Sequence, residues 1–205
     1  MTQLKLVACG DGAIGKTSML VCYAKNEFPE DYVPTVFDNY SASVMIKTVE
    51  IKVQFWDTAG QEEYESIRPL SYPSTDIFLL CFSVVQPVSL TNVAEKWFPE
   101  VKKHCPSSKI AIVGLKIDLR ESTEQVELLR SKGQQPVVIK DVEEFVKEKQ
   151  IQCNGIFECS AKTKVGLKET IESAVKLCVP EEMLNPSAPV STKTIAPKKK
   201  KCVLF

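Results

Sequence analysis

Hydrophobic and polar positions along the chain follow two different periods. In four short runs nearly every position is apolar, as in strands buried on both faces of a parallel sheet. These runs are residues 4–9, 77–82, 109–115 and 156–159. Between and after them, apolar side chains recur at helical spacing in residues 90–101, 142–146 and 167–178. Alternating strands and helices predict an α/β protein in which helices cover both faces of a mostly parallel sheet.

One part of the pattern differs. Residues 40–46 and 49–55 alternate between apolar and polar side chains, with a short link at Lys47 and Thr48. This predicts an antiparallel hairpin, and therefore one antiparallel edge strand. The preceding residues 26–39 are polar and include two prolines, which indicates a loop long enough to carry function.

Two predicted helices carry signals of their own. Pro99 lies near the end of residues 90–101 and predicts a kink or an early stop. Residues 122–132 predict a short polar helix on the surface, with Ser122 and Gln125 spaced as a capping box.

The first strand is followed by Gly10-Asp11-Gly12-Ala13-Ile14-Gly15-Lys16-Thr17, which fits the pattern G-x-x-x-x-G-K-[ST] without substitution. In this pattern backbone N–H groups surround an oxyanion, the lysine reaches the β- and γ-phosphates, and the hydroxyl holds Mg²⁺. The strand–loop–helix context favours a phosphate site over an ordinary glycine turn. The predicted nucleotide contacts here are Ala13, Ile14, Gly15, Lys16, Thr17 and Ser18.

A second glycine loop, residues 57–62, follows the hairpin. Asp57 at the end of a buried strand fits the acidic partner of Mg²⁺, directly or through water. Gly60 offers a backbone N–H, and Gln61 can orient a water in line with the γ-phosphate because it both donates and accepts. Thr35, in the proline-containing loop, could complete the Mg²⁺ shell while a γ-phosphate is present.

Two further motifs select the base. The Asp118 carboxylate could accept two hydrogen bonds from guanine, a donor pair that adenine lacks, while the Lys116 stem packs over the ring. Ser160, Ala161 and Lys162 would close the other side, with the Ala161 N–H donating to the guanine oxygen. Each motif alone is common, but their order after the phosphate loop is informative.

Composition narrows the class of protein. The 205 residues suit one domain with a tail, and 26 basic against 26 acidic residues give no reason to expect a nucleic-acid partner. Eight cysteines without C-x-x-C spacing, and no secretory signal, predict a cytoplasmic protein with free thiols.

The end of the chain has a different composition. Residues 180–197 are rich in Pro, Ser and Thr and predict a disordered linker. Cys202 begins a C-a-a-X ending whose terminal Phe favours geranylgeranylation. Four preceding lysines would supply the second membrane signal, placing the protein reversibly at the cytoplasmic face of a membrane, most simply the plasma membrane. They are Lys198, Lys199, Lys200 and Lys201.

These motifs, together with residues 32–40 and 68–73, resemble those of the small GTPases of the Rho family, close to the Rac subgroup. The resemblance covers residues 4–205. It implies a P-loop NTPase fold of three α/β/α layers with a six-stranded sheet, a G domain over residues 1–179 and a Rho-type insertion at about 120–136. It also implies two mobile switches, residues 26–40 and 60–72, and a cycle in which GTP is bound with Mg²⁺ and slowly hydrolysed to GDP.

The resemblance adds site residues and partners. It implies that Phe28 packs edge-on to guanine, that Tyr32 and Leu119 are nucleotide contacts, and that Gly12 belongs with Lys16, Thr35 and Gln61 at the hydrolytic centre. The implied effector and regulator surface comprises Val36, Phe37, Asp38, Tyr40, Trp56, Tyr64 and Leu70. Expected partners of the monomer are an exchange factor, a GTPase-activating protein, a dissociation inhibitor and cytoskeletal effectors.

One position departs from the family. Leu115 stands where an Asn or Thr normally bonds the glycine-loop backbone, which predicts faster nucleotide exchange with guanine specificity kept by Asp118. No catalytic arginine is evident in the switch loops, so slow turnover and a partner-supplied arginine are expected.

Two alternatives stay open at this stage. One is another P-loop phosphotransferase or ATPase, which Asp118 and the motif at residues 160–162 argue against. The other is a fast-exchanging GTP-binding module that hydrolyses poorly, which the intact Gly12 and Gln61 argue against.

Overall fold

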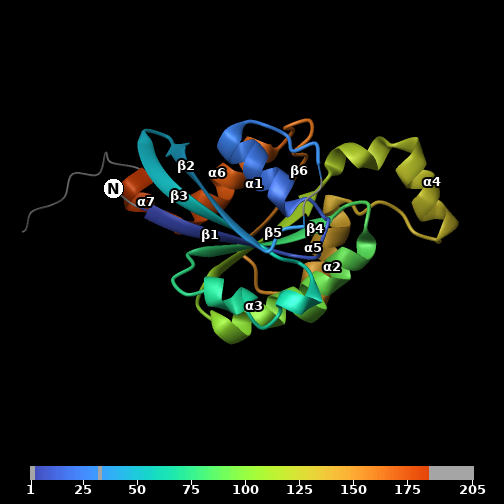
Figure 1. The fold of residues 1–205 in the computed structure, drawn as a ribbon, viewed down its shortest axis with the longest axis horizontal. Coiled ribbons are helices and arrows are strands. Elements are labelled where there is room, and N and C mark those ends of the chain that lie inside the picture. The colour runs from blue at the N-terminus through green and yellow to red at the C-terminus, as the bar shows by residue number, and fades with distance from the viewer. Residues whose placement is uncertain (1–2, 32–33, 185–205) are drawn as a thin grey trace, which may run out of the picture.

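The computed structural model describes residues 3–31 and 34–184. Its centre is a six-stranded sheet of order β2-β3-β1-β4-β5-β6 (Figure 1). The strands are β1 Gln3–Cys9, β2 Phe37–Ile46, β3 Val49–Thr58, β4 Ile77–Ser83, β5 Lys109–Leu115 and β6 Gly155–Cys159. Among the described strands only β2 runs antiparallel to its neighbour, which confirms the predicted hairpin and the mostly parallel sheet.

Helices cover both faces of this sheet and form two hydrophobic cores, one on each side (Figure 1). On one face lie α1 Lys16–Lys25 and α6 Leu167–Cys178. On the other lie α5 Ile139–Glu148 and one long helical stretch made of α2 Pro87–Asn92, the π-helical η3 Val93–Trp97 and α3 Phe98–His104. The three-layer α/β/α architecture is therefore confirmed.

The first strand of the hairpin is longer than its sequence pattern indicates. It begins at Phe37, so the last residues of the predicted loop are paired strand, with Phe37 opposite Thr58 and Asp38 opposite Asp57. The reason is that β3 continues past its alternating segment to Thr58, so the residues just before the predicted strand also find backbone partners in β3.

Of the predicted kink or early stop at Pro99, the early stop is wrong, because the helix continues to His104. The π-helical turn before it explains this tolerance. Phe98 donates its N–H to the carbonyl of Val93, five residues back, and α3 then begins with Pro99 in its first turn. A proline in a first helical turn forfeits no hydrogen bond that the helix needs.

The polar segment near residue 120 is helical, as its pattern predicts. It forms the short 3₁₀ helix η4 Ile117–Glu121 and then α4 Thr123–Ser131, which projects from one end of the molecule (Figure 1). The capping-box prediction is wrong, because the Ser122 side chain makes no capping hydrogen bond. Leu129 is the buried residue of α4, in agreement with a surface helix.

The chain after α6 begins with structure where a linker was predicted. Met183 donates its N–H to the Pro180 carbonyl, and α7 Glu181–Leu184 forms a single helical turn. The predicted lipid site Cys202 and the four lysines before it lie outside the described residues, as does Tyr32. None of the described helices is both long and apolar enough for a membrane span.

Candidate nucleotide site

Four loops meet where the parallel strands end. They follow β1, β3, β5 and β6, and ligands in open α/β sheets bind at this carboxyl edge. Two cavities of about 760 and 240 Å³ lie side by side there and share Gly15, Ser18, Phe28 and Lys116 as lining residues. The larger lies along the glycine loop and the first predicted switch, and the smaller lies between the loops after β5 and β6.

The glycine loop is wound around the Lys16 side chain. Gly15 precedes α1 with a φ of 108°, a left-handed conformation that favours glycine. The buried Lys16 ammonium donates to the carbonyls of Gly10 at 2.9 Å and Asp11 at 2.7 Å. Burial lowers the pKa of Lys16, against the opposing effect of the Asp57 charge. An anion in the loop would therefore meet a charge already held beside backbone N–H groups.

The predicted metal ligands lie together although they come from three separate segments. The Thr17 hydroxyl donates to Asp57 Oδ2 at 2.5 Å, and the Thr35 hydroxyl lies 2.8 Å from that of Thr17 and 3.3 Å from the same carboxylate oxygen. The other oxygen, Asp57 Oδ1, is buried and has no hydrogen-bond partner within residues 3–31 and 34–184. Burial raises the pKa of Asp57, while the Thr17 hydrogen bond and the Lys16 charge oppose that rise. Two hydroxyls and a carboxylate with a free oxygen fit the hard oxygen ligands that Mg²⁺ prefers.

The second switch rests directly on the glycine loop. A Cβ on Gly60 would lie 2.3 Å from the carbonyl carbon of Asp11 and 2.3 Å from the nitrogen of Gly12, so only glycine allows this approach. A Cβ on Gly12 would in turn lie 3.9 Å from Cγ of Gln61. The Gln61 side-chain oxygen is buried and unpaired in the part of the chain that the structure describes, so it is available to accept a hydrogen bond from an attacking water.

Two long-range hydrogen bonds hold the glycine loop against the helical stretch formed by α2, η3 and α3. Both oxygens of Asp11 accept hydrogen bonds from the helical stretch, one from Asn92 Nδ2 at 2.7 Å and one from the Trp97 indole N–H at 2.8 Å. Trp97 is the last residue of the π-helical turn and is fully buried. The sequence shows Trp97 only as a core position, because no local pattern links it to a residue 86 positions away.

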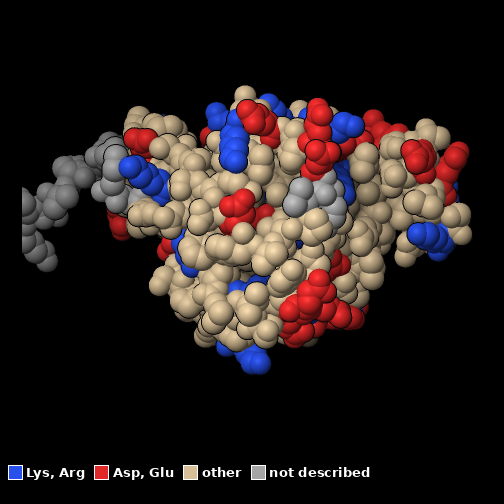
Figure 2. Space-filling view, in the orientation of Figure 1, with Lys and Arg blue, Asp and Glu red and all other residues tan. Residues whose placement is uncertain are grey.

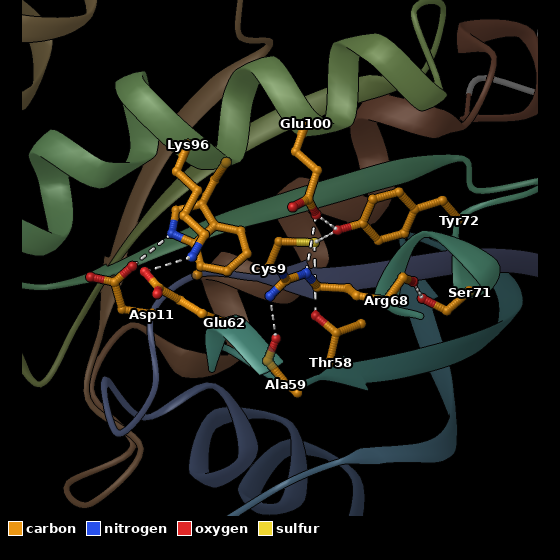
Figure 3. Close-up of polar contacts among 12 residues, drawn as sticks. Cys9, Asp11, Thr58, Ala59, Glu62, Arg68, Ser71, Tyr72, Lys96 and Glu100 are labelled. Carbon is orange, nitrogen blue, oxygen red and sulfur yellow. Dashed lines mark hydrogen bonds and ion pairs between the residues drawn. The ribbon is translucent and has the colours of Figure 1, made fainter. Parts of the chain in front are cut away.

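Arg68 anchors the end of the second switch to the same helix (Figure 3). Its side chain is fully buried; it donates to the Ala59 carbonyl at 2.7 Å and to Glu100 at 3.1 Å, and it stacks 4.5 Å from the Trp97 ring. Tyr72 donates to the same Glu100 oxygen at 2.5 Å. These contacts hold the Arg68 side chain between the second switch and the helical stretch.

The base side of the site is formed by the loops after β5 and β6. Lys116 has a φ of 63° and donates to the Ala13 carbonyl at 2.8 Å, which brings its stem against Gly15. The side chains of Asp118, Leu119, Ala161 and Lys162 line the smaller cavity as predicted. Phe28, which is 43 % exposed, lines both cavities.

Two residues predicted as nucleotide contacts, Ser160 and Ile14, do not line either cavity. Ser160 is buried, and its hydroxyl accepts the Thr163 N–H at 3.0 Å, so it shapes the loop and does not line the smaller cavity. Ile14 is fully buried in the core below the glycine loop.

Leu115 is buried at the wall of the smaller cavity. It pairs in register with Ser83 of β4, so the two side chains share a face of the sheet. The Ser83 hydroxyl oxygen is buried and has no hydrogen-bond partner among the described residues. The apolar side chain at position 115 thus coincides with a polar group left unpaired beside it.

The predicted partner surface is apolar and open to solvent. Val36, Phe37 and Leu70 are exposed, the last by 77 %, and Phe37 packs edge-on against Trp56 at 5.0 Å between ring centres. Tyr40 donates to the neighbouring Asp38 at 2.7 Å, and Tyr64 ends the short helix η1 Glu62–Tyr64.

A groove lined by five glutamates, and also by Lys96, Lys103 and His104, adjoins this surface between η1 and α3. Its glutamates, seen as a group of acidic side chains in Figure 2, are Glu62, Glu63, Glu65, Glu95 and Glu100.

Comparison with known proteins agrees with this geometry. The model of the Ras family matches residues 5–179, so the chain belongs to that family. The chain is also 45 % identical over 201 residues to the GTP-binding protein RHO1 of Saccharomyces cerevisiae, covering 98 % of this chain and 95 % of that protein. Within the Ras family the chain is a Rho-family small GTPase. The resemblance to the Rac subgroup stays a prediction.

Proposed function

We propose that this Rho-family small GTPase is a Mg²⁺-dependent switch that cycles between GTP and GDP at a membrane and signals to cytoskeletal effectors. The observation that carries the proposal is the meeting of Thr17, Thr35 and Asp57. Thr35 belongs to the first predicted switch, whereas Thr17 lies in the first turn of α1 and Asp57 near the end of β3. A ligand that requires all three ties the position of the switch to the presence of a γ-phosphate.

The residues of this chain perform the hydrolytic step by positioning. Mg²⁺, when bound, neutralises charge on the phosphates. Lys16 donates to the phosphate oxygens in place of its two loop carbonyls, and backbone N–H groups of residues 13–18 complete the cradle. Gln61, whose oxygen has no other partner, orients the attacking water, and Gly12 leaves room for it.

Base recognition falls to the smaller cavity. Asp118 accepts the two N–H groups of guanine, while Lys116 and Phe28 cover the ring and Ala161 donates from its backbone. Adenine offers no matching donor pair, so an adenine nucleotide would leave the carboxylate unpaired. Leu115 weakens this side, because it adds no hydrogen bond to the loop and coincides with the unpaired Ser83 hydroxyl.

Regulation follows from slow chemistry and slow release. An exchange factor would open the site, a GTPase-activating protein would supply an arginine, and a dissociation inhibitor would cover a prenyl group on Cys202. The exposed Val36, Phe37 and Leu70 suit an apolar partner surface. The four lysines at 198–201 would hold the lipidated monomer at the cytoplasmic face of the plasma membrane.

Calorimetry and single-turnover kinetics test the proposal directly. We expect GDP and GTP to bind far more tightly with Mg²⁺ than with a chelator, ATP not to compete, and preloaded GTP to release phosphate slowly. Displacement of labelled GDP by ATP would instead indicate another P-loop phosphotransferase. Tight GTP binding without phosphate release would indicate a binding module.

A further inference from the structure

Arg120 connects the base-recognition turn to two other segments. It lies in η4, two residues after Asp118. Its guanidinium donates through Nη1 to Glu158 Oε1 at 2.8 Å and through Nη2 to Glu158 Oε2 at 2.5 Å. The remaining Nε donates to the Val137 carbonyl at 2.9 Å. The pair with Glu158 is thus bidentate, a geometry that fixes both distance and orientation.

Arg120 and Glu158 each lie next to residues that form one wall of the smaller cavity. Glu158 lies in β6, three residues before Ala161, whereas Arg120 lies just after Asp118. The ladder between β5 and β6 ends at the pair Leu115 and Cys159, so both cavity-lining loops extend beyond the sheet's hydrogen bonds. A rigid side-chain link across this gap sets how far apart the loops stand.

The link is protected from solvent more than an ordinary surface ion pair. The Arg120 and Glu158 side chains are 20 % and 28 % exposed. By contrast, the Lys168 and Glu172 pair on α6 has its lysine 75 % exposed and a separation of 3.6 Å. Exposed pairs contribute little, while bidentate, partly buried pairs contribute more.

The third contact brings in the end of the segment that resembles a Rho insertion. Val137 is buried, and its N–H donates to the Val84 carbonyl at 2.8 Å, just beyond β4. Its carbonyl, which accepts from Arg120, is therefore held by the sheet. Arg120 is thus held between two fixed acceptors, Glu158 and Val137.

We propose that Arg120 is a positioning residue for guanine recognition: it holds Asp118 at a fixed distance from Ala161 and thereby slows the release of the nucleotide. The proposal rests on the guanine site proposed above and deepens it. Arg120 does not line either cavity, so it acts through Asp118 and not by touching the base. The phosphate side is held by other residues, so hydrolysis of bound GTP does not depend on Arg120.

The test compares retention, base discrimination and hydrolysis in Arg120→Ala, with Arg120→Lys and Glu158→Gln as second variants. Release of labelled GDP is followed after adding excess unlabelled GDP, and phosphate release is followed in a single turnover. We expect Arg120→Ala to release GDP and GTP about 10-fold faster, equivalent to about 1.4 kcal/mol, with hydrolysis of bound GTP within about twofold of the original protein. Arg120→Lys keeps the positive charge but cannot form the bidentate pair with Glu158, so its release rates fall between those of the original protein and Arg120→Ala.

The affinity for inosine diphosphate, compared with that for GDP, separates a role in positioning Asp118 from a role in stability alone. It lacks the 2-amino group, one of the two donors to Asp118. If Arg120 positions Asp118, Arg120→Ala narrows the difference in affinity between GDP and inosine diphosphate several-fold. The matched control, Lys168→Ala, breaks an exposed ion pair and leaves both nucleotides unaffected.

The results separate this proposal from the one on which it rests. An original protein that does not prefer GDP to inosine diphosphate would overturn the guanine site itself. A preference that survives unchanged in Arg120→Lys and Glu158→Gln, with unchanged release, would overturn only the role of Arg120. An equal loss of affinity for both nucleotides, or a parallel loss of hydrolysis, would likewise contradict it.

Discussion

The phosphate side and the base side of the nucleotide site are built in different ways. On the phosphate side, Lys16 and Asp57 are buried, and the glycine loop is held by hydrogen bonds to the helical stretch beneath it. On the base side, Phe28 is 43 % exposed, and its loops extend past the last sheet pair. Base-side residues lie away from the reacting phosphate, so mutations there can change the release of the nucleotide and leave its hydrolysis intact, whereas phosphate-side residues such as Lys16 affect both.

Removing Lys16 breaks the phosphate side most completely. In Lys16→Met a buried ammonium is replaced by an apolar chain of similar length. Hydrogen bonds to charged groups contribute about 1.5–3 kcal/mol each, so losing two lowers nucleotide affinity by roughly 100- to 10,000-fold. Calorimetric titration with GDP checks this. An affinity within tenfold of the original would mean that the loop binds phosphate without its lysine.

Changing Gln61 affects the chemistry and leaves the grip on the nucleotide intact. Gln61→Leu removes the oxygen that would orient the attacking water. We expect hydrolysis, both intrinsic and stimulated by an activating protein, to fall roughly 10- to 100-fold, while GDP release stays the same. Single-turnover phosphate release measures the first and displacement of labelled GDP the second. Stimulated turnover that persists would remove Gln61 from the mechanism.

Trp97→Phe tests how the glycine loop is supported. Phenylalanine keeps a ring in the core but removes the N–H that bonds Asp11, leaving one carboxylate oxygen without its donor. The free energy of unfolding should fall by about 1–2 kcal/mol, measured by urea denaturation with nucleotide bound. Asn92→Asp, which places a second carboxylate against Asp11, should lower the free energy of unfolding further. Equal stability of the original protein and both variants would show that these hydrogen bonds do not support the glycine loop.

Leu115→Thr is expected to give the smallest effect, confined to the base side. Threonine offers a hydroxyl on the face that carries the unpaired Ser83 oxygen. One net hydrogen bond is worth about 1 kcal/mol, so GDP release should slow roughly fivefold. Leu115→Val, which is branched but has no hydroxyl, is the control. Identical release rates in Thr and Val variants would show that polarity at this position is irrelevant.

Residues whose chemistry requires a fixed spacing could be predicted from the sequence. The glycine loop, Asp57 and Gln61, and Asp118 all lie where their motifs place them, because each motif combines a strand end with a local turn. The sheet was predictable for a similar reason, since buried parallel strands read as continuous apolar runs.

The supporting contacts could not be predicted, because they join distant positions without any local pattern. Asp11 and Asn92 are 81 positions apart, and Arg120 and Glu158 are 38 apart. The π-helical turn was equally invisible, since a helical period does not reveal one extra residue per turn. The sequence therefore predicts a kink or an early stop at Pro99, whereas the turn before it accommodates the proline and the helix continues to His104.

Trp97 has a consequence for observing the protein at work. The chain has two tryptophans, Trp56 and Trp97, and the second is stacked on Arg68 while it donates to Asp11. Its fluorescence is therefore sensitive to charges on the glycine loop and on the second predicted switch. With Trp56 replaced by phenylalanine, a single intrinsic emitter would remain at this junction, and its colour and intensity could report each turn of the cycle in real time without an attached dye.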